Sequence, residues 1–98
     1  MAYKLIWSPA ARDDLHDIVL FIARDNPDRA MAFGFELISE TDRVQTFPES
    51  GRVVPEYRNQ AIREIIFRSY RIVCRIDHER RLCEIVRVWH SARGIPEL

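Results

Sequence analysis

Residues 61–93 read AIREIIFRSYRIVCRIDHERRLCEIVRVWHSAR and decide the fold. They contain runs rich in β-branched and aromatic residues at Ile62–Phe67, Tyr70–Ile76 and Leu82–His90. Arg68-Ser69 separates the first two runs, and the polar residues 77–81 separate the last two. These spacings predict an antiparallel meander of three strands.

Side chains alternate across a strand, so the middle run divides into two faces. We expect Arg71 and Arg75 to share one face, where they form a cationic stripe on an accessible surface. The opposite face is apolar, with Tyr70, Ile72, Cys74 and Ile76.

The third run is apolar on both faces, which predicts a central strand covered on both sides. We expect Ile85 and Trp89 on one face, and Val86 and Val88 on the other. The chain's own helices cover one face in this prediction, and a partner protein covers the other.

The chain of 98 residues predicts one domain, residues 1–98. No apolar run approaches the ~20 residues that span a bilayer, and residues 1–7 lack the features of a secretory signal. We therefore expect a cytoplasmic protein without membrane contact. Cys74 and Cys83 lie in apolar runs and are expected to be buried, reduced thiols. The spacing of cysteines and histidines predicts no metal site, and no cofactor is expected.

The net charge is zero, but residues 1–51 carry 5 − 9 = −4 and residues 52–98 carry 10 − 6 = +4. This asymmetry favours an anionic partner for the second half, although solvated surface charges explain it equally well. Lys4 is the only lysine among fifteen basic residues. Arginine suits phosphate and carboxylate recognition, but a GC-rich genome gives the same bias.

The first half predicts a short strand and a helical hairpin. Residues 3–7 alternate as a strand, and Ser8-Pro9 provides an N-cap and a first helical residue for a helix over residues 9–24. Asn26-Pro27 repeats this pattern for a second helix that ends near Phe47-Pro48. The short connection predicts an antiparallel helical hairpin, which packs on an antiparallel sheet that the meander completes.

The second helix has one apolar stripe and a broader apolar flank. Residues 48–60 are expected to form an irregular connector, and residues 91–98 a short extended tail. The flank broadens the apolar surface enough that we expect this helix to contact both the first helix and the sheet. The stripe is Ala30, Phe33, Leu37, Thr41 and Val44, and the flank is Met31, Phe35 and Ile38.

Several short sequence motifs, taken in their order along the chain, resemble the RelE/ParE superfamily of toxins from type II toxin–antitoxin systems. They are Trp7-Ser8-Pro9-Ala10-Ala11, Asp14-Leu15, Arg63, Tyr70-Arg71-Ile72-Val73, Val86-Arg87-Val88-Trp89-His90 and Arg93. The resemblance covers nearly the whole chain. It implies an α+β fold of order β-α-α-β-β-β, and a growth-inhibiting toxin that a cognate antitoxin neutralises in a hetero-oligomer.

Two branches of that superfamily differ in target. RelE-like members cut messenger RNA on the ribosome, and ParE-like members poison DNA gyrase. The ending Val86–Arg93 and the long helical hairpin are more similar to the ParE branch, so we favour a gyrase-binding toxin. A non-toxic member that only pairs with an antitoxin is a third possibility.

The RelE alternative requires a catalytic set. The resemblance implies that Arg71 and Arg63 hold the scissile phosphate and that His90 is the general acid. Glu64 is the nearest carboxylate, but alternation directs it away from Arg63, which leaves no convincing general base. A net charge of zero also argues against binding in the RNA-lined ribosomal A site.

Each of these residues also has a structural interpretation. His90 can be a surface or capping residue, and Arg87 can pair with a nearby carboxylate such as Glu84. Arg71 and Arg75 can bind an acidic segment of the antitoxin. The residues expected to bind the target or the antitoxin are Arg71, Arg75, Arg87, Arg93 and Trp89. Because an apolar strand face needs a cover, we expect the isolated chain to purify poorly and the co-expressed pair to be soluble.

Overall fold

A helical hairpin and a five-stranded sheet form the fold in the computed structural model, which describes residues 2–98. Met1 of the expected domain lies outside the described residues. The predicted order β-α-α-β-β-β is confirmed, with one added two-residue strand. The elements are β1 (Lys4–Trp7), α1 (Pro9–Ala23), α2 (Pro27–Thr46), β2 (Arg52–Val53), β3 (Ile62–Phe67), β4 (Tyr70–Asp77), β5 (Leu82–His90) and the 3-10 helix η1 (Ser91–Arg93).

The strands lie in the order β1-β5-β4-β3-β2. β3, β4 and β5 form the predicted antiparallel meander, and β5 is a central strand as expected. β1 pairs with β5 in parallel, from Lys4 opposite Leu82 to Trp7 opposite Ile85. The sheet is therefore mixed, and the expectation of an antiparallel sheet was wrong for this strand. β2 lies at the opposite edge and arises within the connector that we expected to be irregular. Gly51 precedes it and has no room for a side chain, because a Cβ atom there would lie 2.7 Å from the Glu64 carbonyl oxygen.

A β-bulge in β5 reverses the expected alternation of that strand. The register shifts between Val73 and Cys74, so Cys74 lies opposite Ile85 but Val73 lies opposite Arg87. Val86 is the extra residue, and an extra residue turns every later side chain to the other face. The expected grouping of Ile85 with Trp89 was therefore wrong. Ile85 and Val88 belong to the core beneath the helices, whereas Val86 belongs to a cluster on the other face.

Both helices begin as predicted. The Ser8 hydroxyl accepts a hydrogen bond from Ala11 N at 3.0 Å, and the Asn26 side chain accepts one from Arg29 N at 3.1 Å. A proline follows each cap, where its fixed φ suits the first helical turn. Thr46 is the last residue of α2, immediately before Phe47-Pro48.

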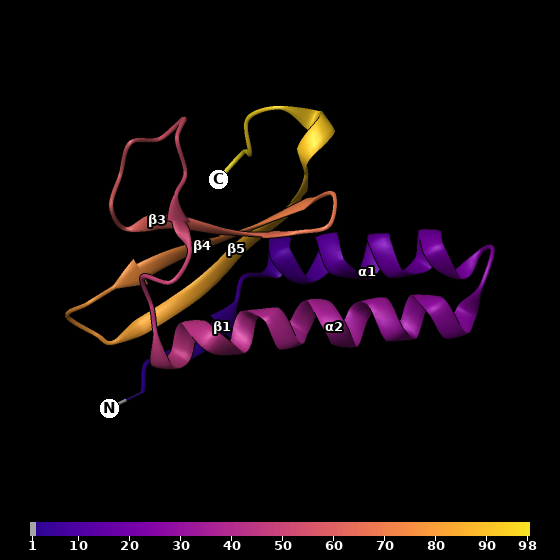
Figure 1. The fold of residues 1–98 in the computed structure, drawn as a ribbon, viewed down its shortest axis with the longest axis horizontal. Helices are drawn as coiled ribbons and strands as arrows, with labels where there is room; N and C mark the ends of the chain where they lie inside the picture. The colour runs from indigo at the N-terminus through magenta and orange to yellow at the C-terminus, as the bar shows by residue number, and fades with distance from the viewer. Residues whose placement is uncertain (1) are drawn as a thin grey trace.

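The main core lies between the hairpin and one face of the sheet, which we call the inner face. All five residues of the predicted α2 stripe are buried, together with Gly34. Leu37 is fully buried, and burial of a leucine side chain contributes roughly 1.5–3 kcal/mol relative to exposure. Figure 1 shows both helices on the same side of the sheet.

Helix α2 contacts both α1 and the sheet, as predicted, but its broader flank is not part of the buried core. Met31 and Phe35 are 63% and 67% exposed, and Ile38 is also exposed. Ala11 is the one buried residue of α1. The hairpin extends past the β3–β4 turn, so its far half has no sheet beneath it (Figure 1). Much of the apolar surface of the hairpin therefore faces solvent.

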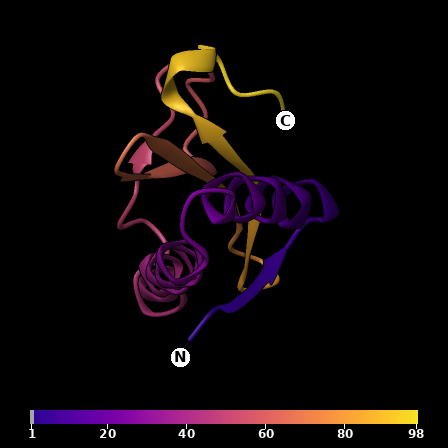
Figure 2. The ribbon, with the colours of Figure 1, turned by 90° about the vertical axis from the view of Figure 1, so that its right-hand side faces the viewer.

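The chain's own connector and tail cover the other, outer face of the sheet, which we had assigned to a partner. Val54 of the connector is fully buried and clusters there with Ile62, Val73 and Val86. Figure 2 shows the C-terminal segment on the side of the sheet away from α2. The tail is not simply extended, because it begins with η1. Within residues 2–98, no helix is long and apolar enough to cross a membrane.

Candidate functional site

Arg71 lies at the centre of an ionic cluster on the outer face. Its Nε atom donates to Glu64 at 2.5 Å, and its two terminal nitrogens donate to the carboxylate of Glu56 at 3.0 and 2.7 Å. Arg52 donates to the other oxygen of Glu64 at 2.6 Å. Arg71 is only 7% exposed. The expectation that its guanidinium lines an accessible surface is therefore wrong, although it does point away from the helices.

The cluster ties the connector to the sheet. Hydrogen bonding to Arg71 lowers the pKa of the Glu56 carboxyl from 4.5 to about 2. The bidentate contact with Glu56 also raises the pKa of Arg71. The carboxylates of Glu56 and Glu64 neutralise the guanidinium groups of Arg71 and Arg52. The positive charge of Arg71 is therefore compensated within the chain.

Arg63 lies on the inner face, near the opposite end of the meander. It pairs with Cys74 in the register, and directly opposed residues share a face. Its guanidinium donates to the carboxylate of Glu49 at 3.0 Å and to the side-chain oxygen of Gln60 at 2.9 Å. Arg63 therefore links the two ends of the connector, at Glu49 and Gln60. Glu64 points to the other face, as predicted.

His90 ends β5 and caps η1. Its Nδ1 atom accepts a hydrogen bond from Ala92 N at 3.0 Å, so the capping interpretation is confirmed. Its ring packs edge-on against Tyr70, with ring centroids 5.1 Å apart. Because Nδ1 is an acceptor, the neutral ring carries its proton on Nε2.

The fold does not bring Arg63, Arg71 and His90 together. Arg71 lies on the outer face, whereas the other two lie on the inner face. Arg63 is level with Cys74 and His90 is level with Tyr70, four residues apart along β4, or roughly 13 Å at the rise of a strand. A single phosphate cannot contact all three side chains in this arrangement.

The first turns of α1 bind the bulge of β5. The Ser8 hydroxyl donates to the Val86 carbonyl at 2.9 Å, and the Asp14 carboxylate accepts a hydrogen bond from Val88 N at 2.9 Å. Asp14 also accepts two hydrogen bonds from Arg87, at 2.8 and 2.9 Å, and this contact raises the pKa of Arg87. The sequence motifs at the start of α1 and at the end of β5 are therefore in direct contact.

Ion pairs on β5 differ from the expected ones. Arg87 does not pair with Glu84, because the bulge directs Arg87 toward Asp14 of α1. Glu84 instead lies opposite Arg75, with 3.7 Å between charged atoms. Half of the Arg75 side chain remains exposed, so Arg75 keeps an accessible cation on the outer face.

Trp89 is buried between two arginines. It is 2% exposed, and the guanidinium carbons of Arg87 and Arg93 lie 4.9 and 3.9 Å from its ring centroid. Both contacts are cation–π interactions. Trp89 therefore fixes the orientation of its neighbours, and Arg93 is the exposed member of this group.

An apolar groove lies between α1 and α2, beside the end of β1. It encloses about 460 Å³ and includes Trp7 at the end of β1, Leu15 and Val19 of α1, and Ile38 of α2. The exposed Met31 and Phe35 continue the Ile38 face along α2 at spacings of three and four residues. β1 is an edge strand of the sheet beside this groove. Arg12 and His16 are the polar residues that line the groove. An exposed apolar patch bordered by polar residues is typical of a protein-binding site.

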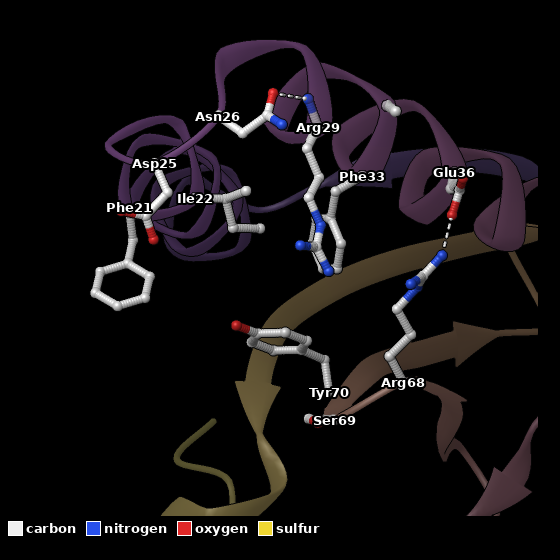
Figure 3. A pocket seen from close by; sticks show the side chains of 11 residues that line it. Phe21, Ile22, Asp25, Asn26, Arg29, Phe33, Glu36, Arg68, Ser69 and Tyr70 are labelled. Atoms are coloured by element: carbon white, nitrogen blue, oxygen red, sulfur yellow. Dashed lines mark hydrogen bonds and ion pairs between the residues drawn. The ribbon is translucent and has the colours of Figure 1, made fainter.

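A second hollow lies between the end of the hairpin and the β3–β4 turn. It has a volume of about 400 Å³, and Figure 3 shows Tyr70 directed toward the hairpin and Arg29 reaching down from α2. Arg68 of the turn donates to Glu36 at 2.5 Å. Burial raises the pKa of Tyr70. The lining is part aromatic and part charged, with two acidic residues (Asp25 and Glu36) and two arginines (Arg29 and Arg68) that balance in charge.

Both cysteines are buried and free, as predicted. Burial is the main cause that raises the pKa of Cys74 to about 12, so it is a poor nucleophile at neutral pH. Across residues 2–98, no group of three or more histidine, cysteine and acidic side chains is placed to hold a metal ion.

Glu56, Asp14 and Tyr57 have structural roles that sequence reasoning missed. Tyr57 donates from its hydroxyl to the Pro96 carbonyl. Glu56 and Tyr57 come from a segment without periodicity, which gives no basis for assigning partners. Asp14 was part of the family resemblance, but its contact depends on the bulge.

These elements define a small α+β protein in which a helical hairpin packs on one face of a five-stranded mixed sheet. The family model for the ParE toxin of the type II toxin–antitoxin system parDE matches residues 5–95. The chain therefore belongs to the family of ParE toxins of type II toxin–antitoxin systems.

Two solved structures have a similar fold. A chain of the chromosomal ParDE toxin–antitoxin system from P. aeruginosa aligns with a TM-score of 0.74 and 16% identity, covering 91% of this chain and 96% of that one. A chain of the toxin–antitoxin complex RelBE2 from Mycobacterium tuberculosis aligns with a TM-score of 0.62 and 23% identity, covering 92% and 99%. Among curated proteins, none matches this sequence significantly.

Proposed function

We propose that this chain inhibits DNA gyrase by binding it, and that a cognate antitoxin neutralises the chain. Membership of the ParE toxin family supports this proposal. The observation that carries it is the separation of Arg63, Arg71 and His90, with Arg71 neutralised by Glu56 and Glu64. A binding toxin needs accessible surface rather than a catalytic centre. Its place of action is the cytoplasm, where gyrase is found.

Arg75 and Arg93 are the arginines of the predicted binding set that a target can reach. The Arg75 side chain is half exposed, and Arg93 is exposed. Arg71, Arg87 and Trp89 are assigned a supporting role, because each is held by contacts within the chain. Exposed cations increase the rate of association with an acidic partner and align it for docking.

We assign the antitoxin to the apolar groove between α1 and α2. The similar chains from P. aeruginosa and M. tuberculosis both belong to toxin–antitoxin assemblies. An amphipathic helix with apolar residues at spacings of three and four would cover Ile38, Phe35 and Met31. The neighbouring edge of β1 can accept an added strand from the same partner.

Ribosome-dependent cleavage of messenger RNA is the second candidate, and one observation favours it. His90 lines a hollow of about 220 Å³ together with Arg93, Tyr70 and Asp14. The proton on Nε2 of the neutral ring is available to donate, because Nδ1 is occupied by the cap. His90 is the group that would serve as general acid in this case.

A supercoiling assay with purified gyrase separates the two candidates. The chain is expected to inhibit supercoiling in proportion to its concentration, and prior addition of the antitoxin is expected to restore it. Primer extension on transcripts from induced cells is expected to show no new cuts at codon boundaries. Cuts at codon boundaries with normal supercoiling would replace this proposal with the nuclease.

A further inference from the structure

The last five residues lie on the outer face and are bound through their backbone. The Gly94 carbonyl accepts a hydrogen bond from Arg71 at 3.3 Å, and the Glu97 carbonyl accepts one from Arg87 at 3.2 Å. The Pro96 carbonyl accepts one from the Tyr57 hydroxyl. The three donors come from β4, β5 and the connector. Side chains of the body therefore recognise backbone oxygens of the tail, which any sequence can supply.

Pro96 is the one tail side chain that enters this site. It is fully buried, whereas Ile95 is 59% exposed and Leu98 is also exposed. Within residues 94–98 the structure assigns no helix or strand. The site therefore holds one proline side chain and three backbone carbonyl oxygens. The carbonyls belong to the proline itself, to the residue two positions before it and to the residue one position after it.

Two of the three donors, Arg71 and Arg87, do not depend on the tail for their positions. Arg71 is fixed by Glu56 and Glu64, and Arg87 is fixed by Asp14. Because both arginines are held in advance, they lose little order when the site is empty, and this preorganisation favours binding of a replacement. Gly94 lies at φ +81°, with nothing within 4 Å of an added Cβ atom, so the tail joins η1 at a glycine with free space around it.

We propose that this site, formed by Tyr57, Arg71 and Arg87 on the outer face, is an exchangeable peptide-binding site. Its second occupant is an irregular, proline-containing segment of a partner protein, which presents the same three carbonyl oxygens in place of residues 94–98. The tail is then a ligand that the chain supplies to itself and that a partner displaces. The helical groove and the gyrase target are not needed for this inference.

A labelled synthetic peptide with the sequence of residues 91–98 tests the proposal. The host is the full chain with Pro96→Asp, since a buried carboxylate expels the chain's own tail. Fluorescence polarisation is expected to show at least about tenfold tighter binding to this host than to the wild-type chain, whose site is occupied. A peptide with aspartate in place of proline is expected not to bind.

Tyr57→Phe in the same host removes one donor and is expected to weaken binding about three- to tenfold. Tyr3→Phe is the matched control, because Tyr3 bonds His78 elsewhere, and it is expected to change nothing. Gly94→Ala, which strains the left-handed backbone at the start of the tail, provides a second host if circular dichroism shows Pro96→Asp unfolded. Equal binding to host and wild type, no binding to either folded host, or no effect of Tyr57→Phe would overturn the proposal. A concentration-dependent wild-type dimer that Pro96→Asp abolishes would assign the site to a second copy and overturn the partner assignment.

Discussion

Among single residues, Arg71 makes the largest set of ionic contacts on the outer face. It joins Glu64 of β3, Glu56 of the connector and the Gly94 carbonyl of the tail. Glu64 is almost completely buried, so its negative charge depends on Arg71 and Arg52 for compensation. Removal of one partner of a buried pair costs more than the pair itself contributes, because a charge is left uncompensated.

Arg71→Met is expected to lower the free energy of unfolding by about 3–5 kcal/mol, measured by urea denaturation. Arg75→Met is the control, because its ion pair is long and half exposed, and should change stability by less than about 0.5 kcal/mol. Combining Arg71→Met with Glu64→Leu should recover part of the loss. Equal stability of the Arg71 and Arg75 variants would contradict the assigned role.

The pKa of Glu56 predicts a loss of stability in acid. The pKa falls from 4.5 to about 2 on folding, so the folded state favours the ionised carboxyl. This contribution is complete above about pH 4.5 and disappears as the pH falls toward 2. The melting temperature of the wild type should therefore fall more steeply over this range than that of Glu56→Gln. Parallel profiles would show that the Glu56–Arg71 contact is absent in solution.

Some of these side-chain contacts could be predicted from the sequence, and others could not. Ser8 and Asn26 were identified as caps because capping depends on residues three positions apart. The partners of Arg71 were missed because Glu56 lies fifteen residues away, in a segment without periodicity. Alternation correctly directed Arg71 away from the apolar face of its own strand and Glu64 away from Arg63, but it contains no information about what covers each face of the sheet.

Among the elements, α1 and β5 meet at the bulge. The Asp14 carboxylate accepts hydrogen bonds from Val88 N and from Arg87, and the Ser8 hydroxyl donates to Val86 O. The strand bounds were predicted well because β-branched runs and polar breaks are local features. The bulge was not, because it depends on how β5 meets both β4 and α1.

Asp14→Ala is expected to destabilise the fold by about 2–3 kcal/mol, since it removes charge-assisted hydrogen bonds and leaves Arg87 and Val88 N without this partner. Asp13→Ala is the control one residue earlier, where the side chain is exposed. Thermal unfolding measures both. If Asp14→Ala lowered the free energy of unfolding by less than about 0.5 kcal/mol, the contact between α1 and the bulge would not contribute to stability.

The exposed face of α2 predicts a change in binding without a change in folding. Ile38→Asp should weaken antitoxin binding at least about tenfold, measured by calorimetry with the purified partner. Ile66→Asp is the control, because Ile66 is similarly exposed but lies on the outer face of the sheet. Equal weakening by both substitutions would exclude the groove as the specific docking surface.

Considered as a whole, the molecule has one apolar surface on the hairpin and one sheet face that its own connector and tail close. The helical flank was predicted as core because its spacing is the same as that of a buried stripe. Periodicity identifies apolar faces but does not say how many of them one chain can cover. The surface left open is the reason to expect a partner.

The most direct test of binding without catalysis is growth arrest by His90→Asn. Asparagine keeps an acceptor for the Ala92 cap but removes the imidazole that a nuclease would use. On induction, the variant is expected to arrest growth within about twofold of the wild type, because binding needs no general acid. Loss of arrest with the variant still folded, together with wild-type cuts in messenger RNA that the variant lacks, would contradict the account.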